Sequence, residues 1–255
     1  MKFTINALKL QKALENLQVK GKHLTSGGFS NSNLGTDVYA TLEDNTLTLL
    51  NGSSLFLVRI QIQVNGDTNG QVSFDSTAII PYLKSFKEDI IFAVGDYVSI
   101  TCGTKKASIP KLVRHEQEES IINLRNMTDH IRYEAEVNNL FTFGKTTFEG
   151  AFTISQETYA NCIKLCELVG SGVYTLNFNE GQVTLSTTQN AQKNYTETIR
   201  PERQIGEPAT LDFSGALHSF FDKDQFLNFY VKDECPLLIV SNDRLIMKAP
   251  YVGGN

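Results

Sequence analysis

Residues 3–17 read FTINALKLQKALENL, and residues 152–166, in the second half of the chain, read FTISQETYANCIKLC. Each stretch opens on Phe-Thr-Ile, which is typical of a strand, and then changes to an amphipathic helical pattern. Superposed, the two place apolar residues at i, i+3, i+4 and i+7, the spacing of one buried helix face. The positions are Leu10, Ala13, Leu14 and Leu17 in one, and Tyr159, Cys162, Ile163 and Cys166 in the other. Both stretches predict a strand followed directly by a helix.

A second pair of similar segments follows in the same order. Residues 72–89 and 209–224 each combine a strand-like run with a short apolar helix pattern. Two halves with the same order of elements indicate a duplicated domain. Between these elements, runs rich in Val, Ile, Leu and Thr alternate with turn residues such as Gly, Asn and Asp. Each half is therefore predicted as β-α-β-β-β-β-α-β-β-β, an α+β architecture built mainly from antiparallel strands.

The predicted boundaries follow from the breaks in these patterns. We expect two similar domains, residues 1–113 and 140–255, joined by a charged connector at 114–139 that carries one apolar run. The stretch 21–36 is rich in Gly, Ser and Asn and is predicted to be a loop. Four helices are predicted, each preceded or opened by a polar residue suited to an N-cap. They cover 7–18, 77–87, 156–169 and 214–222.

Composition excludes several classes of protein. The 255 residues are 41% hydrophobic and 20% charged, enough for one core per half, and contain no apolar run long enough for a transmembrane helix. No signal-peptide pattern precedes the first strand, and the four Cys form no CxxC, so we expect reduced thiols in an intracellular protein. The net charge of −5 argues against a surface that is basic all over, but allows a local basic patch.

The ordered motifs resemble those of a known family, the two-domain DNA polymerase sliding clamps of the proliferating cell nuclear antigen (PCNA) type. The opening Met-Lys-Phe-Thr also resembles the start of bacterial beta clamps. The order of the motifs, more than any single one, carries the resemblance. The other segments that carry it are 47–55, 77–91, 158–170, 220–223, 235–239 and 249–250.

The family implies a fold and an assembly. Each domain of the DNA clamp fold has antiparallel sheets outside and two helices that line the inner face of a ring. A chain of two domains implies a homotrimer, because the three-domain bacterial kind is longer than 255 residues.

The predicted helices carry more lysine than acid, although the whole chain is acidic. A basic helical surface suits contact with duplex phosphates, which positions a protein without reading sequence. The alternative is that these lysines simply face solvent. The residues predicted to face DNA are Lys9, Lys12, Lys20, Lys84, Lys87, Asn161, Lys164, His218 and Lys223.

The resemblance also implies a pocket for peptides of partner proteins, formed by a turn, the connector and the C-terminal segment. The alternative is that the apolar run of the connector only pins it to the sheet. By position, the pocket residues are Leu50, Ile122, Leu124, Pro236, Ala249, Pro250 and Tyr251.

A subunit interface is implied where edge strands of neighbouring chains pair. The family would pair 105–112 of one chain with 181–188 of the next, although the polar second strand also fits an ordinary solvated edge. The residues assigned to this interface are Lys105, Ala107, Ile109, Lys111, Gln182, Thr184 and Ser186.

Enzymatic motifs are missing from the sequence. The four His residues show no HxxxH or HExxH spacing, no Gly-rich phosphate loop opens a helix, and there is no nucleophile elbow. Cys162 and Cys166 lie on the predicted core face without a further ligand nearby, so we expect no catalytic residues, no metal and no cofactor.

We therefore predict a sliding clamp without chemistry of its own. Its partners would be double-stranded DNA, a DNA polymerase and other proteins with a clamp-binding motif, an ATP-driven clamp loader and two copies of itself, with no membrane. It would work inside the cell at DNA, in the cytoplasm and nucleoid or in the nucleus, and a virus-encoded origin is compatible with this. Three alternatives stay open: a monomeric or partner-dependent processivity subunit, a β-rich scaffold without a nucleic-acid role, and an enzyme that holds a metal or cofactor.

Overall fold

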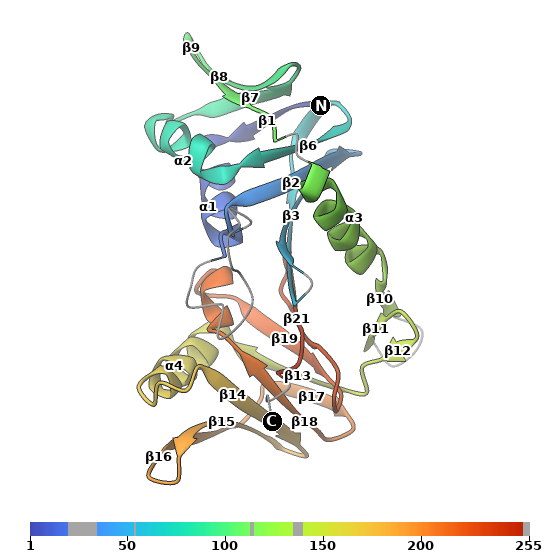
Figure 1. The fold of residues 1–255 in the computed structure, drawn as a ribbon, viewed down its shortest axis with the longest axis vertical. Helices are drawn as coiled ribbons and strands as arrows, with labels where there is room; N and C mark the ends of the chain where they lie inside the picture. Colours follow the sequence, from blue (N-terminus) through green and yellow to red (C-terminus); the bar gives the residue numbers. More distant parts are fainter. Residues whose placement is uncertain (20–34, 54, 113–114, 135–139, 252–255) are drawn as a thin grey trace. The chain divides into compact units, whose positions relative to one another are not determined.

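The computed structural model describes residues 1–19, 35–53, 55–112, 115–134 and 140–251 (Figure 1). These residues form two compact units, and the division along the chain falls between Arg125 and Asn126. Each unit is described below by itself. Starting from β1 and from β13, the elements follow one order in both units: a strand, a helix, five strands, a helical segment and three strands. The shared order agrees with the duplicated sequence pattern, but the predicted number of four strands between the helical segments is one too few.

Unit 1 consists of two antiparallel sheets and two helices. In one sheet the strand order is β5-β1-β7-β8-β9, and in the other it is β4-β3-β2-β6. Helices α1 (Ala7–Leu17) and α2 (Ser76–Ser85) pack against each other and cover strands of the two sheets. The strands are β1 (Lys2–Asn6), β2 (Asp37–Glu43), β3 (Thr46–Ser53), β4 (Phe56–Gln63), β5 (Asn65–Thr68), β6 (Gly70–Asp75), β7 (Asp89–Val94), β8 (Tyr97–Cys102) and β9 (Lys105–Pro110).

Unit 2 repeats this topology. Its strands form one sheet in the order β17-β13-β19-β20-β21 and another in the order β16-β15-β14-β18, and helix α4 (Gln156–Glu167) follows β13 as α1 follows β1. A small sheet, β10-β11-β12, precedes them. The strands are β10 (Ile131–Glu134), β11 (Leu140–Phe143), β12 (Thr146–Thr147), β13 (Gly150–Ser155), β14 (Val173–Asn179), β15 (Gln182–Asn190), β16 (Lys193–Ile199), β17 (Arg203–Gly206), β18 (Ala209–Ser214), β19 (Phe226–Val231), β20 (Leu237–Val240) and β21 (Arg244–Lys248).

The repeated Phe-Thr-Ile motif has the same role in both units. Phe3 on β1 lies opposite Phe92 on β7, and their rings stack with centroids 4.8 Å apart. Phe152 on β13 lies opposite Phe229 on β19 and stacks at the same 4.8 Å. All four rings are buried. Burial stabilises the folded state by about 25 cal/mol for each Å² of apolar surface removed from water. The motif thus decides the fold by placing an aromatic pair at the centre of each core.

The helices begin where their capping residues predict. Asn6 accepts hydrogen bonds from the backbone N–H groups of Leu8 and Lys9, and Ser155 accepts one from Thr158 at 3.1 Å. These side chains satisfy amide groups that the first helical turn leaves without partners. The chain therefore passes from strand to helix at equivalent places in the two units.

The prediction of a fourth helix at 214–222 is wrong. Strand β18 extends to Ser214, and only the four residues of η3 (Leu217–Phe220) form a 3₁₀ turn. Ala216 and Phe221, on either side of η3, both have extended backbone, so only the residues between them form a helical turn. Unit 2 therefore presents η3 where unit 1 presents the full helix α2.

The connector is also more regular than predicted. Residues 115–129 form helix α3 (His115–Asp129), where the sequence analysis expected an acidic loop around an apolar run. The stretch contains good helix formers and neither Gly nor Pro, so local propensity favours a helix. Within unit 1, the guanidinium of Arg125 lies over the ring of Tyr39 on β2, 5.9 Å from its centroid.

Candidate nucleic-acid interface

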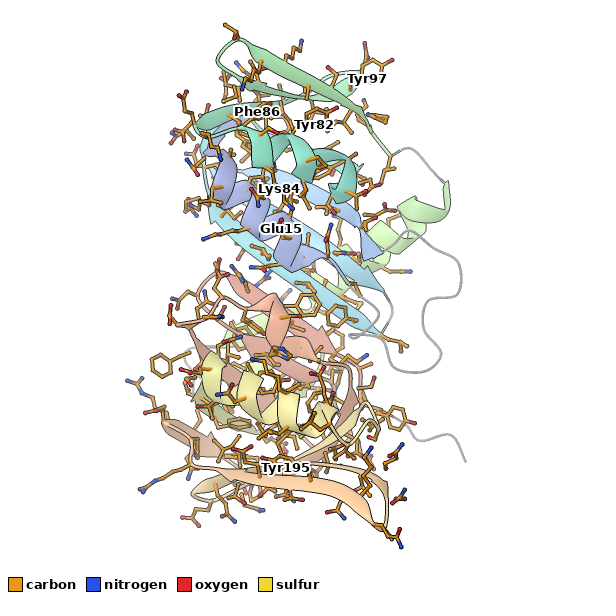
Figure 2. All side chains as sticks on the ribbon, turned by 90° about the vertical axis from the view of Figure 1, so that its left-hand side faces the viewer. Glu15, Tyr82, Lys84, Phe86, Tyr97 and Tyr195 are labelled. Atoms are coloured by element: carbon orange, nitrogen blue, oxygen red, sulfur yellow. The ribbon has the colours of Figure 1, made fainter. Side chains whose placement is uncertain are left out.

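Unit 1 has four of the predicted lysines on or just after its two helices. The buried stripe of α1 faces the core, so Lys9 and Lys12 lie on the exposed side; Lys84 is exposed in the last turn of α2, and Lys87 is exposed two residues after that helix ends. Figure 2 shows the two helices side by side, with Glu15 and Lys84 between them. Lys20, the ninth predicted DNA-facing residue, lies outside the described residues.

Two of these lysines already have partners within unit 1. The Nζ of Lys84 forms an ion pair with Glu15 on α1 at 3.1 Å, and the Nζ of Lys9 donates to the carbonyl oxygen of Gln63 at 3.3 Å. Both contacts are at the surface, where an exposed ion pair is worth less than about 1 kcal/mol, so a phosphate can compete for either ammonium group. Lys12 and Lys87 complete the cationic face of the unit.

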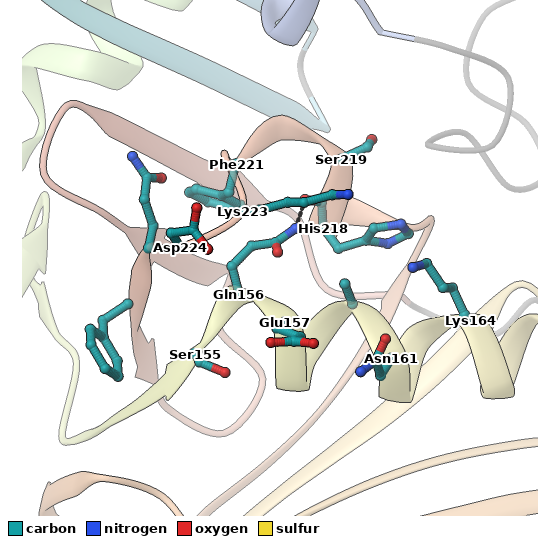
Figure 3. Close-up of a pocket in the computed structure, with 13 residues that line it drawn as sticks. Ser155, Gln156, Glu157, Asn161, Lys164, His218, Ser219, Phe221, Lys223 and Asp224 are labelled. Carbon is teal, nitrogen blue, oxygen red and sulfur yellow. Dashed lines mark hydrogen bonds between the residues drawn. The ribbon is translucent and has the colours of Figure 1, made fainter.

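Unit 2 brings the other four predicted residues together around one pocket. Asn161 and Lys164 project from α4, His218 from η3 and Lys223 from the turn after it (Figure 3). The pocket has a volume of about 600 Å³. Asn161 and Lys223, which are 62 positions apart in sequence, thus line a single cavity beside an exposed helix.

Hydrogen bonds hold the walls of this pocket in place. The backbone N–H of Gln156 donates to the carbonyl oxygen of Gln225 at 2.8 Å, and its side-chain amide donates to the carbonyl oxygen of His218 at 3.1 Å. One residue at the start of α4 therefore ties the helix to both η3 and the following turn. Because Gln156 is buried, these bonds are shielded from water.

A buried arginine anchors the far side of η3. Arg244 on β21 donates to the carbonyl oxygen of Phe220 at 2.8 Å and forms an ion pair with Asp222. It is the side chain that fixes the end of η3 against the sheet, just before Lys223. Sequence reasoning missed Arg244, because a lone arginine in a strand carries no pattern that indicates burial.

The pocket carries both signs of charge. Glu157 and Asp224 line it together with Lys164 and Lys223, and Figure 3 places Asp224 at the opposite end from Lys164 and His218. Sequence reasoning also missed the other nine lining residues, among them Gln156, Gln225 and Phe226. The short apolar run after the Asp-Lys-Asp turn was the available signal, but it indicated only a strand.

The two strands predicted to pair between neighbouring chains differ in their positions in the sheets. Strand β9, which carries Lys105, Ala107 and Ile109, is an edge of its sheet. Strand β15, which carries Gln182, Thr184 and Ser186, pairs with β14 on one side and β16 on the other, so it has no edge to offer. The edge strand is β16, because the chain turns back after Asn190 and covers β15. Lys111 follows β9 and is half-buried.

The residues predicted to form a partner-peptide pocket differ in exposure. Leu50 and Leu124 are buried within unit 1, whereas Ile122 on α3 is 54% exposed. In unit 2, Pro236, Ala249, Pro250 and Tyr251 are partly exposed, and the backbone N–H of Tyr251 donates to the carbonyl oxygen of Asp212 at 2.8 Å. Leu50 and Leu124 therefore have core positions in the chain as described.

The two buried thiols of α4 belong to its packing against β16. Cys162 and Cys166 are fully buried, and a side-chain hydrogen bond with Cys166, together with burial and the nearby Glu197, raises the pKa of the Cys162 thiol. Across the described ranges, no group of three His, Cys, Asp or Glu side chains is placed to hold a metal ion. No helix in the same part of the chain is long and apolar enough to cross a membrane.

Comparison with solved structures identifies the fold. A putative DNA polymerase III beta subunit from Eubacterium rectale superposes with a TM-score of 0.75 at 12% identity, over 98% of this chain and 65% of that one. The PCNA of A. fulgidus, solved with the C-terminal region of FEN-1, gives 0.71 at 10% identity over 100% and 99%. The beta subunit of Pseudomonas aeruginosa gives 0.71 at 10% identity over 99% and 66%.

The chain thus spans about two thirds of the bacterial beta subunits and nearly the whole archaeal PCNA chain. No protein-family model matches the sequence, and no curated protein matches it. The predicted fold class, two similar α+β domains of the DNA clamp fold, is confirmed at the level of the single chain.

Proposed function

We propose that this protein is a DNA sliding clamp, a ring of three chains that encloses duplex DNA and tethers a polymerase and other DNA-processing enzymes. The observation that carries the proposal is the match in fold to a PCNA over essentially the full length of both chains. The exposed lysines of α1 and α2 and the cationic residues of the unit 2 pocket support it independently. The clamp itself would perform no chemistry, and a separate ATP-driven loader would open and close it.

Contact with DNA is proposed for the helix faces. Lysines that neutralise phosphates contribute affinity without sequence preference, and such contacts permit sliding. Lys12, Lys87 and Lys164 are exposed in the described residues; Lys12 lies on α1, Lys164 on α4, and Lys87 two residues after the end of α2. They are the positions where a charge reversal would disturb DNA contact with the least effect on folding.

Ring closure is proposed to pair β9 of one chain with β16 of the next, and this contact between neighbouring chains is called the joint. Both strands are sheet edges of similar length, and unpaired edges are templates for strand addition. Lys105 and Lys106 on β9 and Glu197 on β16 add opposite charges. A contact between two different faces repeats head to tail, and it generates a closed ring when the rotation closes.

An apolar contact beside these strands supports the same joint. Helix α2 packs against β9 and exposes Tyr82, and helix α4 packs against β16 and exposes Leu165 and Leu168. Leu168 is 74% exposed, an unusual position for a leucine at the end of a helix next to an edge strand. Strand pairing would bring these apolar groups from neighbouring chains together and remove them from water.

Partner proteins are proposed to bind through a peptide, as the A. fulgidus clamp was solved with the C-terminal region of FEN-1. In this chain, Ile122 and the partly exposed Pro236, Pro250 and Tyr251 are the predicted residues that keep surface for such a peptide. Tethering then raises the effective concentration of the enzyme at its primer.

The experiment compares retention on closed and open DNA. Wild-type protein, loaded onto a nicked circular plasmid by a clamp loader, should stay bound at 150 mM salt and should leave after a restriction enzyme linearises the plasmid. The variant with Lys12→Glu, Lys87→Glu and Lys164→Glu should load poorly or dissociate. Lys145→Glu, an exposed charge reversal in a turn of unit 2, is the matched control. Equal binding by the triple variant and wild type would favour the scaffold alternative.

A further inference from the structure

Unit 2 contains a cavity where unit 1 has packed helices. In unit 1 the full helix α2 lies along α1, whereas in unit 2 the single turn η3 replaces it and leaves the pocket of about 600 Å³ beside α4. We propose that this pocket binds one nucleoside monophosphate unit, supplied by an unpaired nucleotide of the enclosed DNA. This inference rests on the proposed function, because the ring supplies the strand.

The pocket has two chemically different ends. Lys164 lies nine residues after Ser155, so along α4 the two are about 13 Å apart at a rise of about 1.5 Å per residue. Ser155 pairs with Phe226 on β19, which places this aromatic residue at the Ser155 end. Figure 3 shows Lys164, His218 and Asn161 toward the other end. A base with its sugar and phosphate is an elongated group of comparable length.

The Lys164 end suits a phosphate. Lys164 and Lys223 come from different elements and both line the pocket, and His218 lies between them, buried in η3. Ammonium groups bind phosphate oxygens through charge-assisted hydrogen bonds, and the side-chain amide of Asn161 can donate another. Of the two acidic lining residues, Asp224 lies at the far end and Glu157 lies on α4 between the two ends (Figure 3).

The Phe226 end suits a base. The Phe226 side chain is 58% exposed although it follows a turn at the start of a core strand, and an exposed ring of this kind is a stacking platform for a base. The carboxylate of Asp224, which lines the same pocket, offers acceptors for the N–H groups of a base edge.

The size of the cavity decides between paired and unpaired nucleotides. A volume of about 600 Å³ lies within the range of small-molecule pockets. A base pair cannot enter such a pocket, whereas an extrahelical or unpaired nucleotide can, at the cost of unstacking alone. The proposed ligand is therefore a single nucleotide at a gap, a junction or a primer end.

The test measures binding of free nucleotides and of two DNA duplexes. Calorimetric titration with dAMP, dCMP, dGMP and dTMP should detect binding of at least one. A nicked circle carrying one extrahelical nucleotide should retain the loaded clamp longer than the fully paired circle. Phe226→Ala should weaken nucleotide binding about tenfold, and Lys223→Glu should weaken it independently. Ile205→Ala and Lys145→Glu, exposed positions elsewhere in unit 2, are matched controls.

The outcomes separate this inference from the proposed function. If no nucleotide binds and the extrahelical nucleotide changes nothing, the inference is overturned, while retention on paired circles still supports the clamp. If nucleotides bind but the protein is never retained on circular DNA, the proposed function fails and the source of the nucleotide is not DNA. If Phe226→Ala and Lys223→Glu both bind nucleotides as tightly as the wild-type protein does, the ligand binds elsewhere and the assignment to this pocket is overturned.

Discussion

The hydroxyl group of Tyr159 is an unusual feature of the core of unit 2. The side chain is 1% exposed, its ring packs edge-on against Phe229, and its hydroxyl has no hydrogen-bond partner among the described residues. Burial of this hydroxyl raises the pKa of Tyr159 well above its usual value. A buried polar group without a partner costs about 1–3 kcal/mol.

Removing this hydroxyl should therefore stabilise the protein. Tyr159→Phe keeps the ring contact and is expected to raise the free energy of unfolding by about 1 kcal/mol, measured by thermal denaturation. Tyr39→Phe is the opposing control. The Tyr39 hydroxyl donates a hydrogen bond to the side-chain oxygen of Gln71 at 2.7 Å, and the loss of this bond should lower the free energy of unfolding. A lower Tm for Tyr159→Phe would mean that the hydroxyl is satisfied in solution.

The raised pKa of Tyr174 predicts how the free energy of unfolding changes at alkaline pH. Burial, with Glu167 nearby, raises the pKa of Tyr174 to about 12, whereas the unfolded chain has a tyrosine pKa near 10. Between pH 10 and 12 the unfolded state binds fewer protons than the folded state, so the free energy of unfolding falls as pH rises. This stability is fully present below pH 10, and the loss across the window is up to about 3 kcal/mol. Tyr174→Phe should show a shallower decline in denaturant titrations at pH 9 to 12, and an unchanged slope would contradict the assignment.

The core residues were the most predictable part of the chain. The two copies of Phe-Thr-Ile and the apolar stripes of α1 and α4 indicated strands and helices that the fold contains, because hydrophobic periodicity is the dominant local signal. The positions of individual polar groups were less predictable. Leu50 and Leu124 were assigned to a peptide pocket by resemblance, but no sequence pattern shows that tertiary packing buries them.

At the scale of elements, the errors have different causes. The family resemblance assigned the edge position to β15, and β16, with the sequence KNYTETI, has too little apolar alternation to indicate an edge strand. Helix α3 was missed because its charged stretch was interpreted as a connector, and η3 was overestimated because a repeat implied the length of α2. The pocket of unit 2, which depends on that shortening, could not be predicted from sequence.

The proposed joint makes a sharp prediction about its two halves. Tyr82→Glu damages the β9 half of the interface and Leu168→Glu damages the β16 half, and both positions are exposed, at 45% and 74%, so each chain should fold. Each variant alone should be monomeric by analytical ultracentrifugation. An equimolar mixture should form a species of two chains and nothing larger, because one intact joint is available between unlike chains.

Ile91→Glu, an exposed position on β7 away from both edges, is the control and should assemble as wild type does. A mixture of the two variants that stays monomeric, while each is folded by circular dichroism, would contradict a head-to-tail joint at these residues. Assembly of either variant alone would show that its residue lies outside the interface.

At the scale of the whole molecule, the chain is acidic, with a net charge of −5, and yet exposes lysines on its helix faces. Segregation of charge suits a ring whose inner surface attracts DNA while its outer surface repels it. The duplicated units would supply six similar modules from three chains. The chain needs no catalytic group for this role, because the function depends on topology.

The native mass tests the central claim most directly. Light scattering on purified protein without DNA, across a dilution series at physiological salt, is predicted to give a species of three chains of 28.4 kDa each, stable over the micromolar range. Dissociation on dilution to smaller species would measure the strength of the joint. A mass of one chain at every concentration would contradict a self-closing ring and would leave a partner-dependent processivity subunit as the better account.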